Sequence, residues 1–201
     1  MSVTSAQPGH LFCFGLGYSA SRLAARLGAR GWAVSGTSRS DEQVAAGRAL
    51  DYTMYVFDGT TGGDATWFDG VTHMVVSVPP GRDPVSAGDP VLAHFAEALA
   101  DMRTLSWLGY LSTTGVYGNT DGAWVNETAS LSPNVARSVR RAAAEVAWQG
   151  LAATHGLPLH IFRLAGIYGP GRNVLAQVAT GQARRIIKPG HQFSRIHVDD
   201  I

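Results

Sequence analysis

The sequence predicts an α/β fold, with a doubly wound, mainly parallel β-sheet and helices on both of its faces. Short, near-continuous apolar runs alternate with helix-like stretches from near the N-terminus onward, as in β-α-β units. A glycine-rich turn at residues 15–20 joins the first apolar run to the first helix-like stretch. No internal repeat or linker divides the 201 residues, so a single domain spanning 1–201 is expected.

Six strands are expected where apolar runs are bounded by Gly, Asp, Ser or Pro. A strand of a parallel sheet is buried on both faces, so its sequence is continuously apolar rather than alternating. The predicted strands are residues 10–14, 32–37, 52–57, 71–78, 108–112 and 158–163.

Helices are expected between these strands. Alanines and leucines between residues 20 and 27 recur at helical spacing and predict a helix that covers the sheet. Residues 90–103 and 135–155 are predicted as further helices, and the stretch 79–90, rich in Pro, Gly and Asp, as a loop. The predicted apolar stripe of the helix at 135–155 consists of Val139, Ala142, Ala143, Val146 and Ala147.

The charge and hydropathy of the chain favour a small-molecule partner. A formal net charge of +1, with scattered arginines, gives no field that would hold nucleic acid. No apolar stretch reaches the roughly 18 residues of a membrane span, and the polar start lacks the features of a signal peptide. The single cysteine, Cys13, has no partner for an intrachain disulfide, which favours a buried thiol in a reducing compartment. We therefore expect a cytoplasmic protein that binds neither membrane nor nucleic acid.

Several kinds of chemistry are disfavoured by missing residues. Lys188 is the only lysine, which excludes mechanisms that need a lysine nucleophile or a phosphate-loop lysine at another position. The seven histidines show no HExxH spacing, and one cysteine cannot build a zinc cluster, so no metal site is expected. No Gly-x-Ser-x-Gly motif is present, which argues against a serine hydrolase.

The strongest motif is the turn Gly15-Leu16-Gly17-Tyr18-Ser19-Ala20, at the end of the first predicted strand. The first glycine permits a tight turn, the second lets the backbone approach a diphosphate, and Ala20 keeps helix and strand close. The free N–H groups of the helix N-terminus then attract the anion. This arrangement predicts a Rossmann-type dinucleotide site.

The end of the second predicted strand indicates which dinucleotide is bound. A site for NAD usually has an Asp or Glu there, but this chain has Thr37-Ser38-Arg39. An arginine with two hydroxyls suits the extra 2′-phosphate of NADP, which a carboxylate would repel. Arg39 is alternatively a solvated loop residue, and Asp41 alternatively serves NAD, although it resembles a helix N-cap.

Three further segments carry a family resemblance. Residues 111–118 (LSTTGVYG), 163–171 (RLAGIYGPG) and 196–200 (IHVDD) follow the glycine-rich turn in the same order as in the extended short-chain dehydrogenase/reductase family, the NAD(P)-dependent epimerases and dehydratases. The chain resembles this family over nearly its whole length. Since family members carry a further C-terminal portion that completes the substrate pocket, the resemblance implies that the substrate-binding portion of this chain is incomplete. The resemblance implies an NADP-dependent oxidoreductase or epimerase acting on a polar substrate such as a nucleotide sugar, with a homodimer formed by pairing helices. We also assign Ser77, Val78, Pro79 and Leu164 to the cofactor site.

The resemblance also assigns catalytic positions. Thr113 occupies the place of the serine or threonine that orients substrate, with strand-end capping as the alternative. Arg137 and Arg141 occupy the places of the family's tyrosine and lysine. A guanidinium stays protonated and has no acceptor, so Arg137 cannot replace the tyrosine as acid or base.

The two arginines lie four residues apart and form a cationic patch on one helix face. Arg137 is then a candidate for binding a substrate carboxylate or phosphate, and Arg141 for holding a cofactor ribose or phosphate; a solvated arginine face is the alternative.

Other residues remain as proton donors or substrate ligands. Tyr117 and Tyr168 are the tyrosine candidates, and His191 and His197 also lie in or near family motifs. Arg172, after the second glycine-rich segment, is expected to contact substrate, with a simple turn as the alternative. Because the usual tyrosine and lysine are both absent, a catalytically inactive, NADP-responsive sensor or regulatory module is the rival interpretation.

Overall fold

A computed structural model describes residues 8–81, 88–185, 187, 190 and 192–201 of the chain. Within these residues, six parallel strands form one sheet in the order β3-β2-β1-β4-β5-β6. The strands are β1 (His10–Phe14), β2 (Ala33–Ser38), β3 (Thr53–Val56), β4 (His73–Val76), β5 (Trp107–Thr113) and β6 (Leu159–Leu164). Every predicted strand is confirmed, with ends that differ by a few residues.

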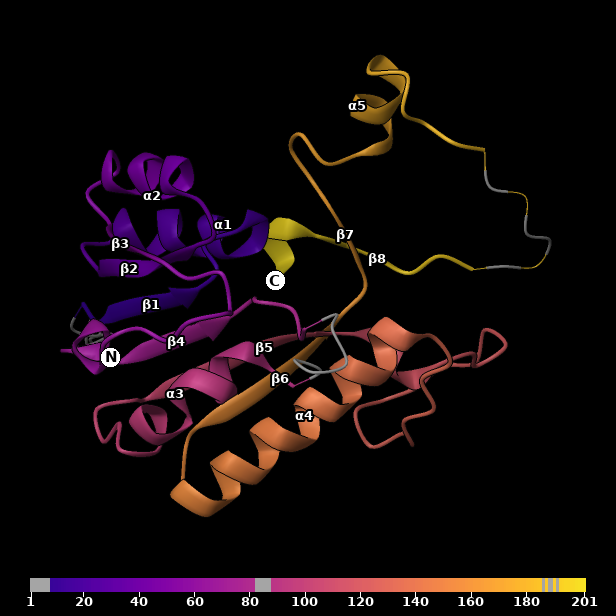
Figure 1. Cartoon of the computed structure of the whole chain (residues 1–201). Helices are drawn as coiled ribbons and strands as arrows, with labels where there is room; N and C mark the ends of the chain where they lie inside the picture. The colour runs from indigo at the N-terminus through magenta and orange to yellow at the C-terminus, as the bar shows by residue number, and fades with distance from the viewer. Residues whose placement is uncertain (1–7, 82–87, 186, 188–189, 191) are drawn as a thin grey trace, which may run out of the picture.

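The helices lie on both faces of this sheet, as predicted (Figure 1). On one face are α1 (Tyr18–Gly28) and α2 (Asp41–Arg48), and on the other are α3 (Pro90–Ala100) and α4 (Ala136–His155). Short 3₁₀ helices are η1 (Ala65–Phe68), η2 (Thr114–Tyr117) and η3 (Val198–Asp200). The predicted doubly wound α/β architecture is therefore confirmed.

A small second sheet stands apart from the main one and was not among the predicted strands. It pairs β7 (Gly166–Tyr168) in parallel with β8 (Arg195–His197). The short helix α5 (Val174–Ala179) lies between these strands in the sequence and has no buried residue. Residues 82–87 of the predicted loop, together with Lys188 and His191, lie outside the described residues.

Two apolar clusters hold the helices to the sheet. On the α3 and α4 side, Phe12, Phe14 and Tyr110 pack with residues such as Phe95 and Trp148. On the α1 side the buried strand residues are smaller and include Cys13, whose thiol pKa is raised by burial. Cys13 is thus the buried small residue that the sequence predicts. No described helix combines the length and apolar character needed to span a membrane.

The predicted apolar stripe of α4 is wrong. Val139 and Val146 are 49% and 64% exposed. The buried residues of this helix are Ser138, Ala144, Glu145 and Trp148. The error arises because a polar side chain that finds a partner can be buried at a position where periodicity alone would require an apolar one.

The start of α2 also differs from the expectation for Asp41. Ser40 is the N-cap, and its hydroxyl accepts a hydrogen bond from the Gln43 amide at 3.4 Å. Asp41 is instead the first helical residue, where its charge is favourable beside the positive end of the helix dipole.

Glu145 and Arg163 form an ion pair between α4 and β6, in which the Glu145 carboxylate is buried and the Arg163 guanidinium is partly exposed. Glu145 is 1% exposed, and its carboxylate accepts hydrogen bonds from Arg163 Nε at 3.1 Å and Nη2 at 2.9 Å. The Ser112 hydroxyl on β5 also donates to Glu145. These bonds raise the pKa of Arg163 above its ordinary value, the hydrogen bond to Glu145 being the largest cause. The pair therefore fixes α4 against the last two strands.

Replacing one partner of this pair should destabilise the fold strongly. Glu145→Leu should lower the free energy of unfolding by about 1.5–3 kcal/mol, because Arg163 and the Ser112 hydroxyl lose their hydrogen bonds to a charged group. The double variant Glu145→Leu, Arg163→Met should lose much less. Urea denaturation followed by tryptophan fluorescence measures both, with Glu97→Leu at an exposed α3 position as control. A loss in Glu145→Leu no larger than in the control would contradict a stabilising role.

Candidate functional site

The candidate site lies at the carboxyl ends of β1 and β4, where the strand order reverses. Gly15 follows β1 with φ +82°, a conformation that favours glycine. Its amide donates to Thr37 Oγ1 at 2.9 Å, and its carbonyl accepts from Ser77 Oγ at 2.6 Å. A Cβ at Gly15 would lie 2.9 Å from that same Ser77 oxygen. The turn is therefore clamped between β2 and β4 and requires glycine.

Gly17 has a different role in the turn. It is the N-cap of α1 but supplies no side-chain cap, and no acidic residue occupies the first helical turn. The first N–H groups of α1 therefore have no partner within the helix. A Cβ added at Gly17 would meet no atom within 4 Å, so the space beside this residue, at the start of α1, is open. The geometry suits a diphosphate that approaches the backbone closely.

The three residues expected to select the cofactor behave differently. The Thr37 hydroxyl braces the turn, and the Ser38 hydroxyl donates to the Gln43 side chain. Both residues are buried. Arg39 is exposed and makes no hydrogen bond or ion pair with the part of the chain that the structure describes. Among the three, Arg39 is thus the side chain left free for a ligand.

The remaining cofactor candidates lie along the same edge of the sheet. Ser77 and Val78 border the turn, since a Cβ at Gly15 would also lie 3.2 Å from Val78 Cγ2. Pro79, two residues after Ser77, is exposed. Leu164 pairs with Thr113 at the ends of β6 and β5.

Two of the expected catalytic residues lie at the two ends of η2, Thr113 as its N-cap and Tyr117 as its last residue. Thr113 Oγ1 accepts a hydrogen bond from the Gly115 amide at 3.2 Å, which is the capping contact foreseen as its alternative role. The Tyr117 hydroxyl accepts from Arg163 Nη1 at 2.9 Å, and the guanidinium lies 5.0 Å from the ring centroid. Tyr168 lies apart on β7, where its ring packs against His197. The structure therefore groups Thr113 with Tyr117 but not with Tyr168.

Arg137 and Arg141 are not equivalent, although both lie on α4. Arg137 is exposed and unpaired within the described residues. Arg141 is half-buried, and its Nη1 donates to the Tyr110 hydroxyl at 2.9 Å. Sequence reasoning missed Tyr110, because a tyrosine in an apolar strand is counted as a core residue.

Tyr110 also leads to a buried carboxylate that the sequence reasoning missed. Asp89 caps α3 by accepting from the Val91 amide at 3.0 Å, and it accepts from Trp148 Nε1 at 3.1 Å. Its carboxylate also interacts electrostatically with Tyr110. Burial raises the pKa of Asp89, and burial together with the charge of Asp89 raises the pKa of Tyr110. The sequence signal available was an aspartate directly before a helix-starting proline.

The second sheet is tied to α1. The Tyr18 hydroxyl donates to the Pro170 carbonyl at 3.1 Å, and the Arg172 guanidinium lies 5.4 Å from the Tyr18 ring centroid. Arg22 donates two hydrogen bonds of 2.9 Å to Asp199, which lower the pKa of that carboxyl. Arg172 is therefore brought beside the first residue of α1.

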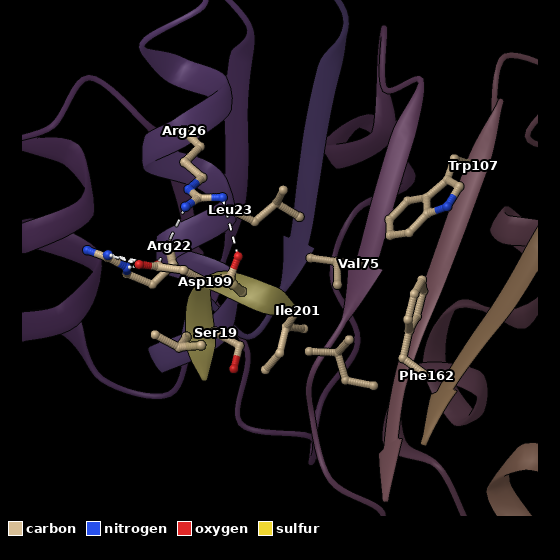
Figure 2. Close-up of a pocket in the computed structure, with 12 residues that line it drawn as sticks. Ser19, Arg22, Leu23, Arg26, Val75, Trp107, Phe162, Asp199 and Ile201 are labelled. Carbon is tan, nitrogen blue, oxygen red and sulfur yellow. Dashed lines mark hydrogen bonds and ion pairs between the residues drawn. The ribbon is translucent and has the colours of Figure 1, made fainter. Parts of the chain in front are cut away.

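Two cavities flank these residues. One, of about 930 Å³, lies between β6, η2 and the segment after η2, and its lining includes Tyr117, Trp124 and Arg163. The other, of about 150 Å³, lies between α1 and the sheet and is bordered by Leu23, Val75, Trp107, Phe162 and Ile201 (Figure 2). Arg22, Arg26 and Asp199 form the polar rim of the smaller cavity. No group of three or more His, Cys, Asp or Glu that could hold a metal ion occurs among the described residues.

Two known proteins are similar to the chain in amino-acid sequence. Protein YeeZ of Escherichia coli K12 is 30% identical over 170 residues, which are 79% of this chain and 59% of YeeZ. A conserved protein of unknown function from Silicibacter pomeroyi, of known structure, is 47% identical with a TM-score of 0.83, over 96% of this chain and 64% of that one. The chain therefore spans less than two thirds of either relative.

More distant structures share the fold. UDP-glucuronic acid 4-epimerase from Bacillus cereus, in complex with NAD, is 18% identical with a TM-score of 0.75, over 95% of this chain and 70% of that one. The family model described as "NAD dependent epimerase/dehydratase family" matches residues 15–201. The chain belongs to the NAD dependent epimerase/dehydratase family.

Proposed function

We propose that this chain binds NADP at the Gly15–Ser19 turn and transfers hydride, as an oxidoreductase or epimerase, to or from a polar substrate. The observation that carries the proposal is the pairing of two features at one sheet edge. The uncapped N-terminus of α1 faces open space at Gly17, and an unpaired Arg39 follows β2 where an NAD site would have an acid.

The residues present fit a dinucleotide. The N–H groups at the start of α1 would bind the diphosphate, and Arg39 the 2′-phosphate, since a guanidinium binds phosphate bidentately. NAD is the alternative cofactor. Asp41 is the acidic residue nearest to Arg39 in the sequence. It lies in the first turn of α2, where the positive end of the helix dipole stabilises its negative charge. When bound, the nicotinamide would accept or supply the hydride.

We assign proton donation to Tyr117. Its oxygen accepts from Arg163, which has no acceptor of its own, so the phenolic proton remains available for another partner. Thr113 is the second candidate, because its hydroxyl accepts from Gly115 and can still donate. Tyr168, on the separate sheet, has less support from the geometry.

The proposed substrate is polar and anionic, such as a nucleotide sugar. The unpaired guanidinium of Arg137 suits a carboxylate or phosphate, and Arg172 beside Tyr18 offers a second cation. Solved structures of the same fold were determined with UDP-glucuronic acid or UDP-glucose bound. A panel of nucleotide sugars and polar carbonyl compounds tests for turnover, with net reduction followed by the absorbance of NADPH and epimerisation, which leaves the cofactor unchanged, followed by chromatography of the products.

The second candidate function is an NADP-responsive binding module without catalysis. Arg137 favours it, because a guanidinium stands exposed where the resemblance expects the acid-base tyrosine. If NADPH binds tightly but no compound of the panel is reduced or epimerised by wild type or Tyr117→Phe, the module is favoured. Turnover that falls in Tyr117→Phe favours the enzyme.

Replacing Gly17 by valine should abolish NADPH binding without loss of stability. The new side chain meets no atom of the protein within 4 Å of its Cβ, but it enters the space through which a diphosphate would approach. Fluorescence titration with NADPH and thermal unfolding measure the two effects. Unchanged NADPH affinity would exclude the assignment of this turn.

Arg39→Ala should weaken NADPH binding about tenfold or more and leave NADH binding nearly unchanged. The lost bond is a charge-assisted one to phosphate, worth about 1.5–3 kcal/mol. Arg30→Ala, which removes an exposed arginine beyond the far end of α1, is the matched control. Equal losses for NADPH and NADH would refute the role of Arg39 in reading the 2′-phosphate.

We propose that two copies of the chain pair through α4. Val139 and Val146 are exposed on this helix, as is Val135 at its N-cap, and pairing would remove their apolar surface from water. Val146→Glu should therefore shift the protein from dimer to monomer in sedimentation velocity. A wild-type chain that is already monomeric at high concentration would contradict this proposal.

A further inference from the structure

The smaller of the two cavities has no part in the proposed function, although it borders the first turn of α1. On this face of the sheet α1 and α2 pack against β1, β2 and β3. The cavity lies next to them, between α1 and strands β4, β5 and β6, with η3 along one side (Figure 2). Its volume is about 150 Å³. The walls are therefore formed by α1, by the sheet and by η3.

The sheet side of the cavity is an aromatic wall. The rings of Trp107 on β5 and Phe162 on β6 have centroids 5.9 Å apart and are inclined by 51°. Gly109 stands two residues after Trp107 on the same face of β5, and a Cβ there would overlap the indole Cη2. The glycine therefore allows the indole to lie over the strand. Val75 on β4 is 2% exposed and continues this wall.

The α1 side of the cavity carries Ser19 and Leu23, which are four residues apart and so share one helix face. Leu23 packs against the buried cluster that contains Val75. Because most of the lining side chains are apolar, water inside would find few hydrogen-bond partners. An apolar cavity of about this volume stays dry and binds a benzene-sized molecule. The body of a ligand would therefore be apolar and about as large as one aromatic ring.

The rim of the cavity adds a positive charge that is not fully balanced. Arg22 donates through Nε and Nη2 to the Asp199 carboxylate, both at 2.9 Å, so these two charges balance each other. Arg26 makes longer contacts, with Nη1 at 3.4 Å from the Asp199 carbonyl oxygen and Nη2 at 3.9 Å from Asp199 Oδ1. The Arg26 guanidinium therefore keeps donors for an anion at the edge of the cavity (Figure 2).

We infer that this cavity is a binding site for a small aromatic carboxylate, with the ring between Leu23 and the wall of Trp107 and Phe162, and the carboxylate on Arg26. Aromatic rings prefer the tilted or offset contacts that such a wall offers, and a guanidinium binds a carboxylate through two parallel hydrogen bonds. Neither Gly17 nor Arg39 lines the cavity, so the inference does not rest on the proposed function.

The test is a titration of the isotope-labelled full chain with phenylacetate, followed by NMR. Phenylacetate should produce a saturable shift of the Trp107 indole N–H signal, which is assigned by its loss in Trp107→Phe. Benzyl alcohol has the same ring without the charge and should bind about threefold or more weakly, as for loss of an ion pair at a partly exposed site. Acetate, which lacks the ring, should produce no shift.

Two variants locate the parts of the ligand. Arg26→Ala should weaken phenylacetate about threefold or more and leave benzyl alcohol unchanged, because only the carboxylate contacts the guanidinium. Arg30→Ala, which removes an exposed arginine beyond the end of α1, is the matched control and should alter neither ligand. Leu23→Phe should abolish binding of both ligands, since the larger side chain enters the cavity.

The series of ligands and Arg26→Ala remain decisive if Leu23→Phe folds poorly, because neither changes the apolar walls. Gly17→Val separates this cavity from the dinucleotide turn. The variant should bind phenylacetate as wild type does, whether or not the wild-type chain binds NADPH. Loss of phenylacetate binding in Gly17→Val, with Trp107 unshifted, would assign the ligand to the turn and contradict the inference.

The other contradicting outcomes concern the ring and the charge separately. Absence of a saturable Trp107 shift with phenylacetate would overturn the site as a whole. Equal affinity for phenylacetate and benzyl alcohol, or an unchanged affinity for phenylacetate in Arg26→Ala, would overturn the selection of a carboxylate.

Discussion

The candidate site depends on one constraint, the clamped left-handed turn at Gly15. Its amide is bound by Thr37 of β2 and its carbonyl by Ser77 after β4, so the two strands that flank β1 hold the turn from both sides. The clamp fixes where α1 begins and leaves the first N–H groups of that helix without partners. Arg39 follows β2, the strand next to β1, whereas Arg141 on α4 contacts Tyr110 of β5, two strands from β1.

Polar contacts hold helix α4 against strands β5 and β6. Its inner face carries Arg141 and Glu145, four residues apart, and each side chain finds its partner on a different strand. Arg141 reaches Tyr110 on β5, whereas Glu145 binds Arg163 on β6. Buried polar groups of this kind are tolerated only when their partners are present, so the two pairs fix both the rotation and the height of the helix. Arg141 is thus accommodated by specific neighbours.

The sequence allowed prediction of the sheet, its helices and the turn, because strands buried on both faces are continuously apolar and glycines mark the turn. It did not reveal the buried face of α4. Tyr110 and Arg141 are 31 residues apart, and Glu145 and Arg163 are 18 apart, so no local period connects them. Periodicity treats each of these polar residues as solvated, and it therefore assigned Val139 and Val146 to the core. The pair β7 and β8 was missed because each strand has only three residues.

The central claim is that this edge of the sheet binds NADP. Calorimetric titration of the unmodified chain with NADPH and NADH in parallel tests it most directly. We expect NADPH to bind with a 1:1 stoichiometry and at least tenfold more tightly than NADH, since Arg39 is free for the 2′-phosphate and no acid replaces it. Tighter binding of NADH would contradict the cofactor preference, and binding of neither would contradict the site.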